Sequence, residues 1–420
     1  MTRIAASDLP GLIRPGMTVF VQGSVGAPLS LLAAIEAASP GLGEVHFVSP
    51  LTPGLNRIAI GPGSAPSSLI SFFDYRDLRQ SFRAGPIEVM PLHYSAIPAW
   101  LERQRIDVAL IQLSPPDADG ICSTGLAADF VPDMLGNARV VIAEINRAMP
   151  PVANGPKVPL ARIDHIVDAD YPLPFIAAPG TDETVARIVA SAAALVRNGD
   201  TIQYGVGRIP QQVVAGLNEH RHLGLHSGLV TPVVRPLIES GAMTGARKSV
   251  DTGRHVTGAA CGEPDFCRWI AAHSQFAFRP VRYTHAIATL AAIDNLVAIN
   301  SVIQVDLFGQ ANAEFAGKRQ VSGSGGLVDF MRGARASRGG RAILCLQSAD
   351  PRAGRSNIVA ALSGPATVCR TDVDYVVTEH GVAALADRSV AARAEALIAI
   401  AAPEFRDQLR AECAADTSFM

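Results

Sequence analysis

The chain has 420 residues, of which 48% are hydrophobic and only 5% aromatic, with 37 Gly and 29 Pro. This length is too great for one ordinary hydrophobic core and predicts about two domains, and the composition is typical of short Val/Ile/Leu strands and Ala-rich helices joined by tight turns. The net charge of −2 and the even scatter of 36 Lys and Arg exclude the basic footprint of a protein that binds nucleic acid or an anionic membrane.

Location and thiol chemistry follow from simple patterns. The first 16 residues lack the apolar stretch of a signal peptide, and no run approaches the roughly 20 apolar residues that span a bilayer, so we expect a cytoplasmic protein. The closest two of the six cysteines, Cys261 and Cys267, are separated by five residues. This spacing favours buried free thiols over a disulfide framework or a zinc site, and we expect no metal.

An order of turn, strand, glycine loop and helix occurs twice. The first copy begins with residues 13–21 and the second with residues 196–202, and each is followed by glycines, a proline and an apolar helical pattern: Gly23, Gly26 and Pro28 in the first, Gly205, Gly207 and Pro210 in the second. Such a repeat predicts a duplicated α/β domain. The boundary is expected in residues 178–183, which gives an amino-terminal domain of residues 1–180 and a carboxy-terminal domain of residues 181–420.

Continuous apolar runs recur in both halves, at residues 44–48, 108–111, 140–143, 296–299, 342–344 and 375–377. Continuous rather than alternating runs are typical of parallel strands that are covered on both faces. The predicted fold class is therefore α/β, with two related open-sheet domains of mostly parallel strands and covering helices.

Two glycine loops are candidates for ligand binding. Gly205-Val206-Gly207-Arg208-Ile209-Pro210 follows a predicted strand, and Ser322-Gly323-Ser324-Gly325-Gly326 precedes a helical pattern. Ligands of open α/β sheets bind beyond the carboxyl ends of strands, where such loops expose backbone N–H groups. The alternatives are a structural turn for the first loop and a flexible connector for the second.

Polar side chains near these loops are further candidates. Residues 299–314 are expected to form a strand that ends in a glycine turn and directs Asn300, Gln304 and Asp306 to one face, although a half-exposed strand would show the same pattern. His226 precedes Ser227-Gly228 and is a candidate site residue because histidine often takes part in chemistry near neutral pH.

Taken together, these segments resemble the acetyl-CoA hydrolase and CoA-transferase family over nearly the whole chain. The motifs that carry the resemblance are the GVGRIP loop at 205–210 and residues 107–112, 114–117 with Gly120, 142–146, 149–150, 300–314, 322–329, 372–381 and 403–406. The resemblance implies two related α/β domains with the active site between them. It also implies transfer of coenzyme A, of the acetyl-CoA or 4-hydroxybutyryl-CoA type, between a thioester and a small carboxylic acid in acetate metabolism.

In such enzymes a glutamate attacks the thioester carbonyl and forms an anhydride and then a glutamyl-CoA thioester. The resemblance implies CoA-binding and oxyanion roles for Gly205, Gly207, Ile209, Pro210, Gly323, Gly325 and Gly326. This chain departs from the family pattern where the glutamate is expected, because Gly228 stands there. The chain departs from the family motifs at two more places. Thr231-Pro232 stands where an Asp-Gly pair is expected, and Gln304 stands where a Glu is expected.

Three functions remain open. A CoA-transferase would need a displaced carboxylate, such as Asp306 or Glu314, in the missing role. An acyl-CoA hydrolase would place an activated water in the space beside Gly228. A catalytically silent acyl-CoA-binding protein would keep only the CoA site. In each case the expected partners are acyl-CoA, with a small carboxylate for the transferase, and we expect a homo-oligomer.

Overall fold

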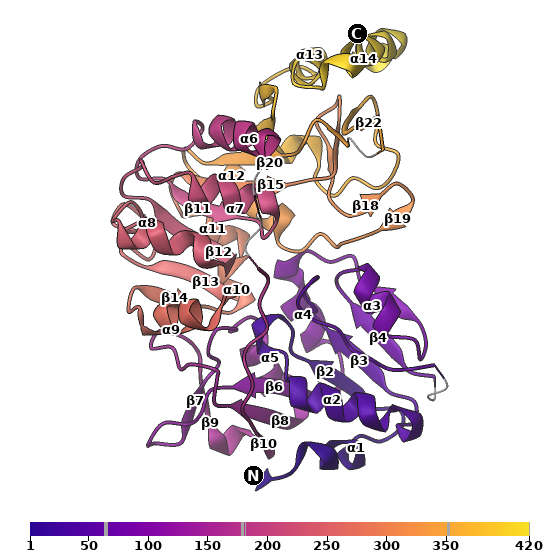
Figure 1. The fold of residues 1–420 in the computed structure, drawn as a ribbon, viewed down its shortest axis with the longest axis vertical. Coiled ribbons are helices and arrows are strands. Elements are labelled where there is room, and N and C mark those ends of the chain that lie inside the picture. The colour runs from indigo at the N-terminus through magenta and orange to yellow at the C-terminus, as the bar shows by residue number, and fades with distance from the viewer. Residues whose placement is uncertain (63–65, 178–179, 181, 351–352, 420) are drawn as a thin grey trace. The chain divides into compact units, whose positions relative to one another are not determined.

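The chain divides into two units (Figure 1), seen in a computed structural model that describes residues 1–62, 66–177, 180, 182–350 and 353–419. The first unit contains Met1–Ala177, Val256–Thr284 and Val321–Gly325, and the second contains Ala178–His255, His285–Gln320 and Gly326–Met420. Residues 178, 179 and 181, on which the expected domain boundary falls, lie outside the described residues.

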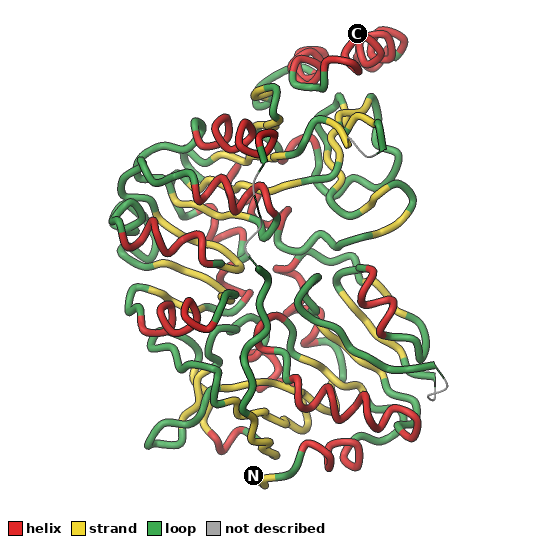
Figure 2. Tube along the Cα trace, in the orientation of Figure 1, coloured by secondary structure: helices red, strands yellow, loops and turns green. Residues whose placement is uncertain are grey.

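The first unit is built on an eight-stranded sheet in which all neighbouring strands are parallel. Figure 2 shows the strands in yellow and the helices in red. Its spatial order is β1 (Thr2–Arg3), β10 (His165–Ala169), β8 (Ala138–Asn146), β6 (Ile106–Leu113), β2 (Thr18–Val21), β3 (His46–Ser49), β4 (Ser68–Ser71) and β5 (Ile87–Val89). Val19 and Val21 belong to one buried cluster and Phe20 to another, so apolar side chains cover both faces of the sheet.

The first unit also contains shorter elements. Its helices are α1 (Leu9–Leu12), α2 (Leu29–Ala38), α3 (Arg76–Ser81), α4 (Ile97–Glu102), α5 (Val131–Asn137), α9 (Pro264–Ala272) and α10 (Val281–Thr284). Its other strands are β7 (Ile121–Ser123), β9 (Lys157–Pro159), β14 (Phe276–Phe278) and all but the first residue of β13 (His255–Ala260).

The central sheet of the second unit repeats the strand order of the first. It runs β12 (Gly224–Val230), β11 (Thr201–Tyr204), β15 (Leu296–Ser301), β20 (Arg341–Cys345), β24 (Tyr375–Thr378) and β25 (Gly381–Ala384), and only the last pair is antiparallel. The series β12-β11-β15-β20-β24 has the chain order of β3-β2-β6-β8-β10 in the first unit. The prediction of two related, mostly parallel α/β sheets is therefore confirmed.

Helices and small sheets complete the second unit. The helices are α6 (Glu183–Ala193), α7 (Arg208–Ala215), α8 (Arg235–Glu239), α11 (Ile287–Ala291), α12 (Leu327–Ala336), α13 (Val390–Ala399) and α14 (Arg406–Ala415). The short strands are β16 (Gln304–Asp306), β17 (Ala311–Asn312), β18 (Phe315–Ala316), β19 (Arg319–Gln320), β21 (Ala349–Asp350), β22 (Arg355–Ser356) and β23 (Ile358–Val359). No helix among the described residues has the length and apolar character needed to cross a membrane.

The segment 299–314 does not form the single strand that we expect from its sequence. β15 ends at Ser301, and β16 belongs to a separate three-stranded sheet with β17 and β23. The chain changes sheets because Val302 N still bonds to Cys345 O at 3.3 Å, whereas Ile303 N already bonds to Asn312 O at 2.8 Å. Asn300 and Asp306 therefore lie on different sheets, and the expectation of one shared face is wrong.

Candidate functional site

The loop between β11 and α7 lies directly on the carboxyl end of β15. Gly205 N donates to Ile299 O at 2.9 Å. A Cβ atom added to Gly205 would lie 2.8 Å from Asn300 Oδ1, and one added to Gly207 would lie 2.6 Å from Ser301 Oγ. A side chain at either position would therefore have to displace the side chain of Asn300 or Ser301, and glycine avoids this.

The same loop presents one apolar side chain to solvent. Val206, between the two glycines, is 46% exposed, and Gln211 Nε2 holds its carbonyl oxygen at 2.6 Å. Ile209 is half-buried in the first turn of α7 and Pro210 is buried there, where proline is compatible with a helix. The loop is thus a fixed turn with one exposed apolar residue between two partly exposed glycines.

Asn300 joins two strands beneath this loop. Its Nδ2 donates to Gln203 Oε1 at 2.9 Å, and Gln203 Nε2 donates back to Asn300 Oδ1 at 3.3 Å. Both side chains are buried, so the reciprocal amide pair fixes the ends of β11 and β15 relative to each other. The structure therefore places Asn300 next to the glycine loop, where its side chain helps to position the loop.

Gly228 lies in β12 beside an imidazole that comes from another part of the second unit. A Cβ on Gly228 would lie 2.8 Å from both Cε1 and Nε2 of His285, and one on Gly326 would lie 2.5 Å from its Cδ2 and Nε2. The His285 ring also packs against Phe330, with ring centroids 4.7 Å apart. The structure thus brings Gly228 and Gly326 together around one residue that sequence reasoning missed.

The His285 ring is buried and has a second imidazole nearby. His285 is 3% exposed and His226, on the same strand as Gly228, is fully buried. Burial lowers the pKa of His285 from 6.5 to about 3, and the nearby His226 makes a smaller contribution to this shift. The ring is therefore a neutral imidazole at every pH at which the protein would normally be handled.

Asp306 and Glu314, which the sequence suggests as displaced carboxylates, are engaged in loop structure. Asp306 Oδ1 accepts hydrogen bonds from the N–H groups of Phe308 and Gln310, both at 3.1 Å, and Oδ2 accepts one from Gln310 Nε2 at 2.8 Å. Burial raises the pKa of Asp306. Glu314 Oε2 accepts from Thr367 Oγ1 at 2.8 Å. Among the described residues, neither carboxylate is brought into contact with Gly228.

The second glycine loop is fixed within the first unit up to Gly325. Gly325 O accepts from Tyr94 N at 2.9 Å, and Ser324 Oγ donates to Leu92 O at 3.0 Å. A Cβ on Gly323 would lie 2.1 Å from Phe72 O. Gly326 belongs to the second unit and is the N-cap of α12. The loop is thus held by defined bonds, unlike the flexible connector that we left open.

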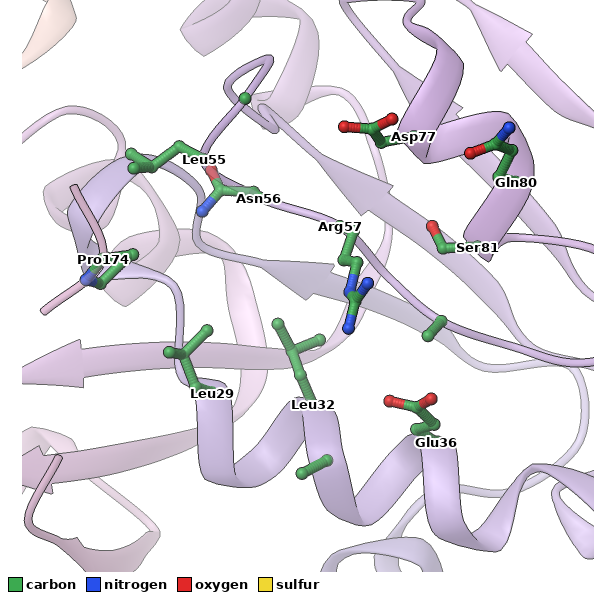
Figure 3. Close-up of a pocket in the computed structure, with 13 residues that line it drawn as sticks. Leu29, Leu32, Glu36, Leu55, Asn56, Arg57, Asp77, Gln80, Ser81 and Pro174 are labelled. Atoms are coloured by element: carbon green, nitrogen blue, oxygen red, sulfur yellow. The ribbon is translucent and has the colours of Figure 1, made fainter. Parts of the chain in front are cut away.

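A pocket of about 580 Å³ lies in the first unit, away from any residue that the sequence singles out. Its lining comes from α2, residues 54–59, α3 and Pro174 (Figure 3). Figure 3 shows the Arg57 side chain extending between α2 and α3, and Glu36 and Asp77 line the same pocket. One guanidinium against two carboxylates does not favour the phosphate groups of CoA, so we do not place CoA there.

The Lys248 side chain donates a hydrogen bond to the backbone of β12, and its replacement should destabilise the second unit. The side chain is 3% exposed, and Nζ donates to Leu225 O at 3.1 Å and to Arg254 O at 2.8 Å. We expect Lys248→Met to lower the free energy of unfolding by about 2 to 4 kcal/mol, because one buried and one partly buried carbonyl group lose their donor. Urea denaturation at pH 7.5 measures this loss.

The same lysine predicts a pH dependence of stability. Burial lowers the pKa of Lys248 from 10.5 to about 8. Between these values the unfolded chain binds more protons than the folded chain, so the contribution of Lys248 to stability rises as the pH increases from about 8 to 10.5. Denaturation curves at pH 7.5 and 9.5 should show this rise in the wild type relative to Lys248→Met; equal pH dependence in the two proteins would contradict it.

Three described features bear on a metal or on thiol chemistry. The described residues contain no cluster of three or more His, Cys, Asp or Glu arranged to hold a metal ion. Four of the six cysteines are buried, Cys369 is exposed and Cys413 is partly exposed. Burial raises the pKa of Cys345 to about 12, as expected for an inert core thiol.

Comparison with known proteins identifies the family. Residues 2–177 match the acetyl-CoA hydrolase/transferase N-terminal domain, and residues 262–413 match the acetyl-CoA hydrolase/transferase C-terminal domain. The chain is 36% identical to 4-hydroxybutyrate coenzyme A transferase of Clostridium kluyveri over 80% of this chain and 79% of that protein. It is 35% identical to butyryl-CoA:acetate CoA-transferase of Anaerostipes caccae over 76% and 74% of the two chains.

A solved structure shows the same architecture. The crystal structure of RipA from Yersinia pestis superposes with a TM-score of 0.89 and 28% identity, covering 99% of this chain and 97% of that one. The two matched domains, the repeated strand order and the glycine turns at the ends of β11 and before α12 therefore lead to one conclusion: the chain belongs to the acetyl-CoA hydrolase/transferase family.

Proposed function

We propose that this chain transfers coenzyme A between an acyl thioester and a small carboxylic acid, as an acyl-CoA:carboxylate CoA-transferase of the acetyl-CoA or 4-hydroxybutyryl-CoA type. Its relatives with 35% and 36% identity are named as transferases of this kind. The observation that carries the proposal is the fixed glycine loop at 205–207, which lies against β15 and leaves Val206 exposed between two partly exposed glycines.

This loop suits the pantetheine arm of CoA. Pantetheine combines amide groups with an apolar chain, so it needs backbone hydrogen-bonding groups beside an apolar contact. Gly205 and Gly207 supply partly exposed backbone, and Val206 supplies the apolar surface. We assign Ile209 and Pro210 to the same CoA-binding segment, because they begin the helix that fixes the loop.

The glycines before α12 suit a thioester oxygen. Gly326 caps α12, a helix of ten residues, and the N-terminal N–H groups of a helix favour negative charge. We assign an oxyanion-stabilising role to Gly326, and to Gly323 and Gly325 the role of shaping the loop that leads to it.

We assign the attacking carboxylate to the acceptor acid, because Gly228 supplies none. A carboxylate oxygen of the acceptor attacks the thioester carbonyl carbon, the C–S bond breaks and CoA leaves as a thiolate. The thiolate then attacks the acceptor's carbonyl carbon in the mixed anhydride, which releases the original acyl group as a free carboxylate. Every atom is accounted for, and no group of the enzyme is acylated. Such a reaction requires both substrates to be bound together.

Hydrolysis is the second candidate, and the bare backbone of Gly228 favours it. Gly228 is partly exposed, so water can reach its backbone, although the His285 ring occupies the space of a side chain there. A water activated by a base gains roughly 10²–10⁴-fold in rate. Acyl-CoA hydrolysis would then need no acceptor.

The products distinguish these functions. We expect purified protein with butyryl-CoA and acetate to form acetyl-CoA, detected by liquid chromatography and mass spectrometry, and to form none without acetate. Thiol release from butyryl-CoA without acetate would instead establish a hydrolase. Neither product, together with a raised melting temperature in millimolar butyryl-CoA, would identify a catalytically silent acyl-CoA-binding protein.

Assembly and location are part of the same proposal. We expect a homo-oligomer, since closed symmetric assemblies are the common state of soluble oligomeric enzymes. Size-exclusion chromatography with light scattering measures it, and a monomeric mass at micromolar concentration would contradict it. The cytoplasmic location expected from the sequence stays a prediction, which fractionation of the source cells checks.

A further inference from the structure

The His285 ring lies in the space that a side chain at position 228 would occupy. Its Cε1 and Nε2 atoms are both 2.8 Å from the position of a Cβ on Gly228, well inside van der Waals contact. A glutamate there would have to place its Cβ against the ring and its carboxylate beyond it. With His285 in this position, the ring would have to move before that side chain could fit.

The His285 ring also lies close to a second glycine, Gly326. A Cβ on Gly326 would come within 2.5 Å of the same imidazole. Two glycines from different elements, β12 and the N-cap of α12, thus surround one ring, and Phe330 packs beside it. The small residue at position 228 and the large residue at position 285 are therefore complementary in size.

We propose that Gly228 and His285 form a complementary pair, in which the imidazole takes the space of a side chain at position 228 and so determines that this site holds no enzyme carboxylate. The inference rests on the proposed function, because it names the residue that decides which route CoA transfer takes. In the native chain the group at this point is an imidazole, and the carboxylate comes from the acceptor.

The charge state of the ring agrees with this geometry. A carboxylate in the same space would be a buried anion, whereas the His285 imidazole is neutral, because burial and the nearby His226 hold its pKa low. The neutral imidazole therefore occupies a space in which a carboxylate would need a compensating positive charge.

Changing both residues should install the missing chemistry. Gly228→Glu with His285→Ala provides a carboxylate and the room for it. Its oxygen can attack the thioester carbonyl, expel CoA thiolate and form an acyl-glutamyl anhydride. Attack of the thiolate on the glutamyl carbonyl then gives an enzyme-bound CoA thioester and a free acyl carboxylate. Intact-protein mass spectrometry after incubation with acetyl-CoA detects this adduct, and hydroxylamine removes it.

The amount of adduct is compared between the variants and the wild type. We expect the adduct in Gly228→Glu with His285→Ala, at least ten-fold less of it in Gly228→Glu alone, and none in the wild type. Gly228→Gln with His285→Ala is the matched control, because it fills the same space without a nucleophilic carboxylate, and it should form no adduct. Equal adduct with and without His285→Ala would overturn the proposal. So would a double variant whose melting temperature rises with acetyl-CoA but which forms no adduct.

A second measurement does not depend on the glutamate variants. Gly228→Ala places a Cβ against the ring, so we expect it to lower the urea midpoint of unfolding in the wild-type background and to have little effect in the His285→Ala background. Equal effects in both backgrounds would overturn the proposed pair. Neither test uses the native transfer rate, so failure of the pair and failure of the CoA-transferase function give different results.

Discussion

Gly323→Ala should abolish most of the CoA-transfer activity, because the new methyl group collides with the backbone of the same unit. The added Cβ would lie 2.1 Å from Phe72 O and 3.1 Å from Phe72 C, atoms that follow β4 and cannot rotate away. The loop must then leave its docked position, where Ser324 and Gly325 are bonded to Leu92 and Tyr94. A displacement of about 1 Å at catalytic groups can cost about 100-fold in rate, and we expect at least about that loss in the rate of acetyl-CoA formation from butyryl-CoA and acetate.

The stability of this variant should fall much less than its activity. Forced overpacking costs about 1 to 3 kcal/mol, a loss that circular dichroism with urea denaturation measures. Gly136→Ala is the matched control, because it adds the same methyl group to α5 of the same unit with no atom within 4 Å. It should keep wild-type activity. A fully active Gly323→Ala protein would show that the loop geometry is not needed for transfer.

Asp200→Ala should produce the largest loss of stability among single substitutions in the second unit. Asp200 Oδ2 lies 2.5 Å from Arg341 Nη2, and the two side chains are only 3% and 7% exposed. It also accepts a hydrogen bond from Arg197 N at 2.6 Å. Removing one partner leaves a buried, uncompensated guanidinium, so we expect the free energy of unfolding to fall by about 3 to 5 kcal/mol. Urea denaturation at neutral pH measures it.

Two further variants separate charge from packing. Asp294→Ala removes the partner of Arg338, whose side chain is 85% exposed, and should leave the free energy of unfolding near that of the wild type. Asp200→Ala with Arg341→Met removes the isolated charge and should recover much of the stability lost in Asp200→Ala. If the double variant is no more stable than Asp200→Ala, the loss comes from the turn at Arg197 and not from the buried cation.

The regular elements could be predicted because their signal is local. Residues 108–111 and 296–299 are apolar without alternation, and the structure places them in β6 and β15, buried on both faces. The repeated order of strand, glycine loop and helix likewise appears as β2 with α2 and β11 with α7. A period of apolar residues and a glycine at a turn are properties of a few neighbouring residues, which a sequence displays directly.

The failures have a different physical origin. Residues 299–308 carry a strand pattern, yet the chain leaves β15 for the small sheet of β16. Val302 N donates to Cys345 O, which is distant in sequence, whereas Ile303 N donates to Asn312 O across the following glycine turn. Strand pairing of this kind is set by tertiary structure and not by local propensity. Asp306 looked available from its spacing, but its own turn uses both of its oxygens.

His285 could not be found from the sequence. It lies between α10 and α11, where no sequence motif marks it, and only the fold brings it against Gly228 and Gly326. The unusual feature that the sequence does display is the glycine itself at position 228. A glycine where the family motif leads us to expect a charged side chain indicates that something else fills the space, and the structure identifies what fills it.

The source of the oxygen in the released acid tests the central claim most directly. The measurement is a single turnover with enzyme in excess over butyryl-CoA, in the presence of acetate labelled with oxygen-18 in both positions, followed by mass spectrometry of the released butyrate. If the acceptor's carboxylate attacks the thioester, butyrate gains one labelled oxygen in the first turnover, and the new acetyl-CoA keeps the other. Unlabelled butyrate would contradict the claim, because its oxygen would then come from an enzyme carboxylate or from water.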